Sequence, residues 1–218
     1  MKGDGRCAAA SAALAALLWV GACGSAAPPV ELSNDWPSRA SDYGEATERW
    51  TRHGSDSAKG SDSISSQVLD VYATFKSPEW RAAHIDFLRR THKLPDSEVA
   101  ALTSKEQAEA AERYEVALMV ATYDRRTNDL QKGERSSWRV ALVDQDGAEI
   151  VADQILRDRR PRDTVKAEFP HMGDFHEPYV VRFPRTVDLM RPGATRFSLK
   201  VTGPQGGVVL TWAEGTGK

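Results

Sequence analysis

The spacing of apolar residues changes near Tyr114, and this change constrains the fold more than any other feature of the chain. Between residues 64 and 113 apolar positions recur every three or four residues, which is typical of amphipathic helices. After Tyr114 the spacing becomes two, which is typical of strands with one buried face. The sequence therefore predicts an α+β protein, with a helical region over residues 64–113 packed on a β domain over residues 114–218.

Seven strand-like runs follow Tyr114, separated by turn residues. Asp146-Gly147 is a strong hairpin turn, and the Gly-rich stretch 203–207 joins the last two runs. Because the strands follow one another without an intervening helical pattern, we expect a C-terminal antiparallel β-sandwich, immunoglobulin-like or related. The runs cover residues 116–120, 138–142, 150–156, 165–169, 179–183, 197–201 and 208–212.

Three or four short helices are expected before these strands. One helical pattern covers residues 68–75. Ser77-Pro78-Glu79 then begins another, because serine is a good N-cap and proline is favoured at the first helical position. After Pro95, Thr103 and Glu106 resemble a capping box that opens a polar helix through Arg113.

The first 23 residues have the pattern of an export signal. Lys2 and Arg6 give a positive start, and residues 8–20 are small or apolar, which is too short for a convincing transmembrane helix. Val20-Gly21-Ala22-Cys23 closes this run and resembles the lipobox of bacterial lipoproteins. The alternative is a plain signal peptide cut near Ala26 or Ala27.

The lipobox resemblance implies an anchor and a location. In that family the signal peptide, here residues 1–22, is removed and Cys23 becomes an acylated first residue. Two or three acyl chains make release from a membrane slow. The resemblance implies the cell envelope, and Gly24 favours the outer over the inner membrane, facing either the periplasm or the cell surface.

Removal of the signal peptide also decides the composition of the mature chain. Cys7 is lost with it, so no disulfide can form within the chain. The whole chain has a formal charge of −2, and losing Lys2, Arg6 and Asp4 makes it −3. This balance gives no reason to expect a nucleic-acid partner.

Residues 23–63 are rich in Gly, Ser, Asp and Pro, and they predict a lipidated flexible tether. Trp36, Tyr43 and Trp50 are exceptions, and we expect them to dock on the folded domain. Within this stretch Arg52-His53-Gly54 resembles the phosphate-accepting signature of histidine phosphatases. There the motif ends a buried parallel strand, whereas here it leads into a serine-rich stretch, and this context argues against phosphatase chemistry.

The segment between the strand runs at 165–169 and 179–183 carries the best chemical constellation. His171, Asp174, His176 and Glu177 are residue types that bind zinc. The spacing of the two histidines is not that of one helical turn, and no further ligand is identifiable. The simpler interpretation is a surface loop in which Phe175 packs downward, and any ligand would more readily be a peptide or protein than a metal ion.

A second candidate surface is basic. Arg157, Arg159, Arg160 and Arg162 lie close together with Asp158 and Asp163, and they offer contacts for anionic lipid or glycan phosphate. A solvated loop is the simpler interpretation of this run.

These observations predict a lipid-anchored envelope protein that acts as a non-catalytic binding or assembly module with an envelope protein as its partner. No catalytic residue is assigned and no cofactor is expected, because the chain has no GxSxG, Walker, CxxC or dinucleotide motif. Two alternatives stay open. One is a metal-assisted hydrolase of an envelope polymer acting through the loop around His171, and the other is a small-ligand-binding lipoprotein.

Overall fold

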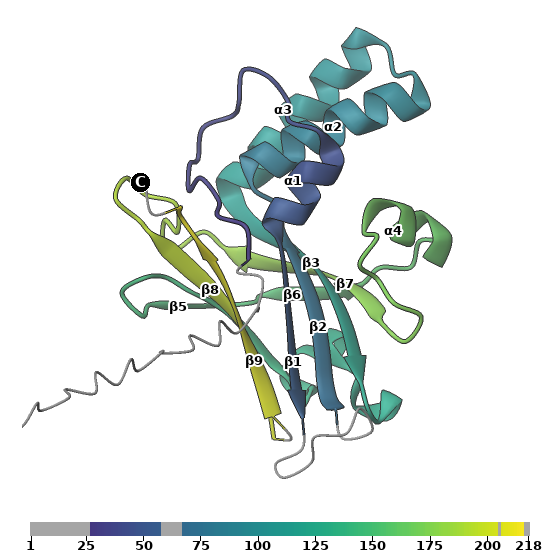
Figure 1. Cartoon of the computed structure of the whole chain (residues 1–218), viewed down its shortest axis with the longest axis vertical. Coiled ribbons are helices and arrows are strands. Elements are labelled where there is room, and N and C mark those ends of the chain that lie inside the picture. The colour runs from purple at the N-terminus through teal and green to yellow at the C-terminus, as the bar shows by residue number, and fades with distance from the viewer. Residues whose placement is uncertain (1–26, 58–66, 205, 216–218) are drawn as a thin grey trace, which may run out of the picture.

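Two antiparallel sheets carry the β structure in the computed structural model, which describes residues 27–57, 67–204 and 206–215 (Figure 1). The five-stranded sheet has the order β1 (Thr51–Ser57), β2 (Gln67–Phe75), β3 (Arg113–Thr122), β7 (Glu177–Pro184), β6 (Gln154–Arg157). The four-stranded sheet has the order β5 (Glu149–Val151), β4 (Arg139–Val143), β8 (Arg196–Gly203), β9 (Gly206–Ala213).

The two sheets contact each other along both edges. At one edge Nε of Arg52 on β1 donates to the carbonyl oxygen of Thr211 on β9 at 2.8 Å. Gly54 allows this approach, because a Cβ there would lie 2.7 Å from the Leu210 side chain. At the other edge the chain passes from β5 to β6 through Ala152 and Asp153. The β part of the molecule is therefore linked along both sides.

The core lies between the sheets and consists of their inward residues. Period-two alternation turns Leu69, Val71, Ala73 and Phe75 of β2 inward, and each is at most 1% exposed. Aromatic rings add to this layer, because the Phe197 centroid lies 4.7 Å from Phe75. A core of this size stabilises a chain whose described residues contain no cysteine.

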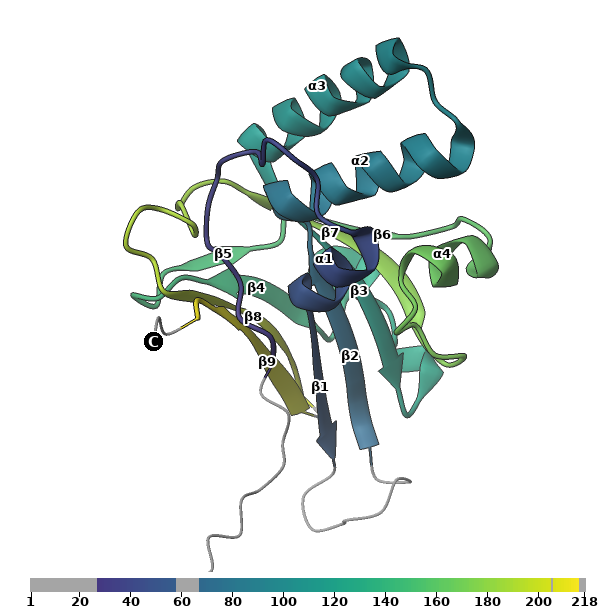
Figure 2. The same ribbon diagram turned by 45° about the horizontal axis from the view of Figure 1, so that its top comes forward.

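Helices lie at one end of the sheets and beside the five-stranded sheet (Figure 2). They are α1 (Tyr43–Trp50), α2 (Pro78–His92), α3 (Asp96–Glu112) and α4 (Arg162–Glu168), and two 3₁₀ turns are η2 (Arg125–Thr127) and η3 (Leu130–Arg135). Ser77 Oγ accepts the backbone N–H of Trp80 at 3.1 Å, which confirms the predicted start of α2. The predicted polar helix is confirmed as α3, but it begins at Asp96 rather than near Thr103.

Several segment predictions were wrong. The tether predicted over residues 23–63 is ordered from residue 27 to residue 57 and contains α1 and β1. Val30 and Leu32 are buried in the core, which is why this stretch is part of the fold. As expected, Tyr43 and Trp50 dock on the domain and are 7% and 1% exposed.

Two segments have a different secondary structure from the one predicted. Residues 67–75 form strand β2 rather than a helix, because their period-two apolar residues face the core. Conversely, the predicted strand around Val165 is helix α4. The fold class is confirmed at the level of a mixed α+β protein with two antiparallel sheets.

Candidate functional site

A cluster of histidines lies on the outer face of the five-stranded sheet. His53 of β1 and Asp70 and Tyr72 of β2 point outward, because they alternate with the core-facing residues. His53 Nε2 lies 2.6 Å from Asp70 Oδ1, and its ring stacks on Tyr72 with centroids 4.2 Å apart. We call the five residues His53, Asp70, Tyr72, His171 and His176 the histidine cluster.

His176 brings the segment between α4 and β7 onto this cluster. Its ring is 6% exposed, and Nε2 lies 3.1 Å from Asp70 Oδ2, within ion-pair distance but off the line of a hydrogen bond. Nδ1 accepts the backbone N–H of Gly173 at 3.1 Å. The neutral ring must therefore carry its proton on Nε2, facing the carboxylate.

Asp70 is the charged centre of the histidine cluster. Burial alone would raise its pKa, but the two imidazoles, His176 and His53, lower it below the usual range of an aspartate. The same carboxylate, together with burial, raises the pKa of Tyr72. Asp70 therefore stays ionised at neutral pH and contacts His53 of the neighbouring strand β1 and His176 of the loop at once.

Arg162 at the start of α4 holds the same loop from its other side. Its guanidinium donates to the carbonyl oxygens of His176 (3.0 Å), Asp174 (2.8 Å) and Gly173 (3.3 Å). Phe175 lies within the segment that is held in this way, yet its side chain is 71% exposed. The loop thus presents an aromatic ring to solvent from a fixed backbone, contrary to the expectation that Phe175 packs downward.

Arg125 of η2 lies against this exposed ring. Its Cζ is 5.4 Å from the Phe175 ring centroid, a cation–π contact. Tyr123, two residues earlier in the chain, is 77% exposed. We call Tyr123, Arg125 and Phe175 the aromatic patch.

The four residues predicted as possible metal ligands do not converge. Asp174 forms an ion pair with Lys166, and Glu177 lies 3.7 Å from Arg157. His171 is exposed, and its ring stacks on Tyr72 with centroids 5.7 Å apart. Of the four predicted ligands, only His176 contacts Asp70, the carboxylate of the histidine cluster.

A metal ion also does not fit the His176 ring as it is oriented. Coordination through Nε2 would require the proton on Nδ1, where it would oppose the N–H of Gly173. Among residues 27–57, 67–204 and 206–215, no three His, Cys, Asp or Glu side chains are grouped as metal ligands.

Three of the four arginines of the basic run are engaged within the molecule. Arg160 pairs with Asp158 and Glu168, Arg162 holds the loop as described, and Arg157 lies over the Tyr179 ring. Arg159 is exposed and forms no ion pair with the described residues. Of the four arginines predicted to contact anionic lipid or glycan phosphate, Arg159 is therefore the one whose charge is not paired with the described residues.

Arg52 has a structural position. Its guanidinium donates to four carbonyl oxygens, those of Thr211, Arg49, Thr51 and Pro28, and burial lowers its pKa to about 10. His53 points to the opposite side of the strand. The arginine and histidine of the phosphatase-like tripeptide thus face away from each other, so the resemblance does not extend to the geometry.

A helical arm projects from one end of the sheets. It consists of α2 and α3, which lie side by side as a hairpin (Figure 2). None of the seventeen residues of α3 is buried. Trp36 lies at the base of the arm and lines three hollows, of which one of about 310 Å³ lies against α2 and α3 and one of about 370 Å³ lies against α1.

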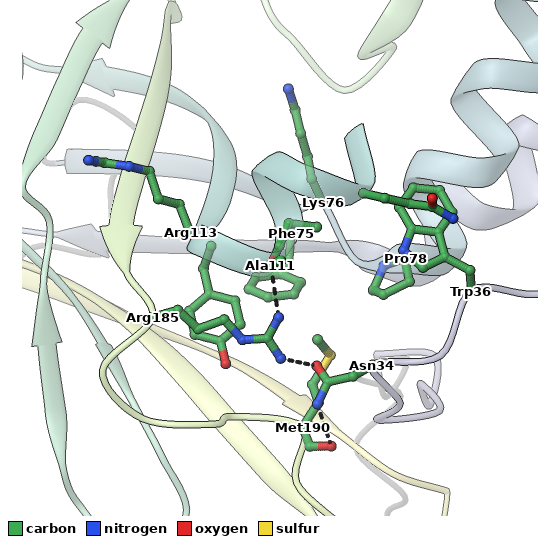
Figure 3. Close-up of a pocket in the computed structure, with 12 residues that line it drawn as sticks. Asn34, Trp36, Phe75, Lys76, Pro78, Ala111, Arg113, Arg185 and Met190 are labelled. Carbon is green, nitrogen blue, oxygen red and sulfur yellow. Dashed lines mark hydrogen bonds between the residues drawn. The ribbon is translucent and has the colours of Figure 1, made fainter. Parts of the chain in front are cut away.

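A smaller cavity of about 110 Å³ lies next to Trp36 (Figure 3). Arg185 crosses it and donates to the carbonyl oxygen of Ala110 (2.8 Å) and to Oδ1 of Asn34 (2.6 Å). Lys76 and Arg113 also line the cavity, but their charged groups point away and pair with carboxylates. Through these hydrogen bonds Arg185 connects the N-terminal segment to the end of α3.

Sequence reasoning missed His53 and Asp70 as neighbours of the loop around His176. The signal for Asp70 was present, because residues 69–75 fit period two as well as they fit a helix. Nothing in the sequence indicated that β1 and the loop meet, because 123 positions separate His53 from His176. Cys23 lies outside the described residues.

Comparison of the chain with family models, with curated proteins and with solved structures found no match. In the part of the chain that the structure describes, no helix has the length and apolar character needed to cross a membrane.

Proposed function

We propose that this is a lipid-anchored bacterial envelope protein that acts as a non-catalytic binding or assembly module. Acylated Cys23 holds it at a membrane, with the outer membrane favoured, and the α2–α3 arm binds an envelope protein. The observation that carries this proposal is the exposure of α3, a seventeen-residue helix with no buried residue.

The exposure of α3 needs a reason, because surface helices normally bury an apolar stripe. Val99, Leu102 and Thr103 of α3 are only half-buried, and one hollow beside Trp36 is bounded by both helices of the arm. A partner that covers the arm would bury these residues as helix-in-groove interfaces do. The proposed binding surface is therefore α3 together with the hollow at its base.

We infer further that the two sheets form an immunoglobulin-like sandwich. In that fold one sheet has the strand order A-B-E-D and the other contains C-F-G. Lettering the strands in chain order from β2 gives β2-β3-β7-β6 for the first sheet, and β4-β8-β9 with β5 at its edge for the second, which supports this type. On this assignment β1 is an addition, and the arm is an insertion between the first two strands.

Photo-crosslinking in cells tests the proposed partner surface. A photoreactive residue at Ala101 or Ala108, both exposed on α3, should capture one envelope protein, whereas the same residue at Val209, exposed on β9, should not. Cys23→Ala should abolish the capture by releasing the protein from its membrane.

Two results would count against this proposal. One is equal capture from α3 and from Val209. The other is persistence of the capture from a photoreactive residue at Ala101 when Ala108→Glu is added to a chain that keeps its circular dichroism spectrum.

One observation favours small-ligand binding as a second candidate function. A hollow of about 560 Å³ opens where the chain crosses between the sheets, and it lies within the size range of ligand sites. Trp138, Val140, Val151 and Ile155 form its apolar part, and Ser137 and Gln154 are among its polar groups. Val151→Phe, which places a ring in this space, should weaken ligand-induced quenching of Trp138 fluorescence, and unchanged quenching would argue against a ligand here.

A further inference from the structure

The aromatic patch combines two highly exposed aromatic rings with an arginine. Tyr123 and Phe175 have the largest exposed fractions among the described large hydrophobic side chains, 77% and 71%. Arg125 lies against Phe175 and forms no ion pair with a carboxylate among the described residues. We propose that this patch docks on the anionic headgroup region of the membrane to which the chain is anchored.

The loop is built to keep Phe175 exposed. Arg162 holds the backbone through three carbonyl oxygens, and Asp70 holds His176, the next residue. A flexible loop would let the ring fold back onto the protein, and this one is fixed on both sides. A preordered loop binds without the entropic cost of being ordered on contact.

The charge around the patch suits an anionic surface. Arg125 is joined by Arg126 and Lys166, and the carboxylates nearby are those of Asp124 and Asp174. Each carboxylate already pairs with one cation, so the guanidinium of Arg125 is left for a phosphate. Exposed aromatic rings flanked by basic side chains are typical of protein surfaces that lie in the membrane interface.

The anchoring segment is long enough to bring this surface to the membrane. This inference rests on the proposed acylation of Cys23. The five residue steps from Cys23 to Pro28 span at most about 18 Å. The Pro28 carbonyl is held by Arg52, near the start of β1.

Strand β1 also has five residue steps between Arg52 and its last residue, Ser57, and these steps cover about 17 Å along the sheet. The anchor can therefore reach the end of the domain where β1 and β3 finish, and the arm lies at the other end (Figures 1 and 2). In this orientation the patch faces the lipid while the arm projects away from it.

Vesicle flotation tests this inference without the anchor. The chain of residues 23–218 carrying Cys23→Ala cannot be acylated, and we expect it to bind phosphatidylglycerol–phosphatidylethanolamine vesicles more tightly than phosphatidylcholine vesicles. Phe175→Ser should lower its partition coefficient about tenfold, from the loss of one buried aromatic side chain. Arg125→Glu should remove the preference for anionic lipid.

Val209→Ser is the matched control, because Val209 is 60% exposed on the other sheet and should change nothing. Absence of vesicle binding, or equal binding by the Phe175→Ser chain, would overturn the proposal. So would capture of a protein rather than lipid by a photoreactive group at Tyr123 in cells. The mass of the native membrane-extracted chain reports acylation separately, so failure of the anchor and failure of the patch remain distinguishable.

Discussion

His176 Nε2 lies 3.1 Å from Asp70 Oδ2, and this contact joins the loop before β7 to the second strand of the sheet. We expect Asp70→Asn to destabilise the fold by about 1–2 kcal/mol, because a buried imidazole loses its charged partner. Amide hydrogen exchange of residues 171–176 should rise more than that of β3. Asp174→Asn, in the same loop but exposed, is the control and should leave stability nearly unchanged.

Glu115 is the carboxylate of a second, buried charge network. Burial would raise its pKa, but Lys76 and Arg182 lower it to about 2. Its stabilising contribution is present above pH 4.5 and is lost as the pH falls toward 2, because the unfolded chain then binds the proton more tightly.

Replacement of Glu115 should reveal the same network at neutral pH. Glu115→Gln should cost about 3 kcal/mol in denaturant unfolding, since it leaves the partly buried cations Lys76 and Arg182 without their counter-charge. Glu149→Gln, which removes the partner of the solvent-facing side chains of Arg139 and Lys200, should cost much less. Equal costs for the two variants would show that burial adds nothing to this network.

His84 should give the fold a dependence on mildly acidic pH. Its ring lies among Tyr43, Trp80 and Phe87, and burial lowers its pKa to about 4. The unfolded chain takes up the proton first, near pH 6.5, so stability falls as the pH drops from 6.5 toward 4, by up to roughly 3 kcal/mol. In His84→Phe that slope should disappear from thermal melts, while His92→Ala, at an exposed helix end, should keep it.

Arg52 should hold the N-terminal segment to the sheets. Its removal in Arg52→Met leaves the carbonyl oxygens of Pro28 and Thr211 without their donor, so we expect a loss of about 2–4 kcal/mol. Protection of the Val30 amide, which donates to the Ala213 carbonyl, should fall first. Arg139→Met, on the exposed face of β4, should leave both quantities nearly unchanged.

Patterns that depend on local physics were predictable from the sequence. The Ser77 cap, the Asp146-Gly147 turn and the alternation around Tyr179 and Phe197 all appear as predicted, because each is decided within a few residues. Residues 67–75 were misassigned because two periods fit the same letters, and only the neighbouring strands decide between them.

The histidine cluster was beyond local inference. His53 stood in a stretch whose composition resembles a flexible linker, and its position follows from β1 pairing with β2, with His53 opposite Tyr72. The ordering of this stretch depends on Val30, Leu32 and Trp50 reaching the core. Isolated apolar residues in a polar segment therefore carried more information than the average composition.

The insertion of the arm has a consequence for how the chain folds. Phe75 and Val116 pair in register across β2 and β3, yet they are separated by the whole helical hairpin. Closing a flexible loop of this length costs conformational entropy, whereas two helices that pack side by side bring the strand ends together through local contacts that form quickly. The folded hairpin would then hold the ends of β2 and β3 close together. Sequence changes that weaken the α2–α3 hairpin should therefore slow the formation of the sheet, even though they remove no contact within the sheet.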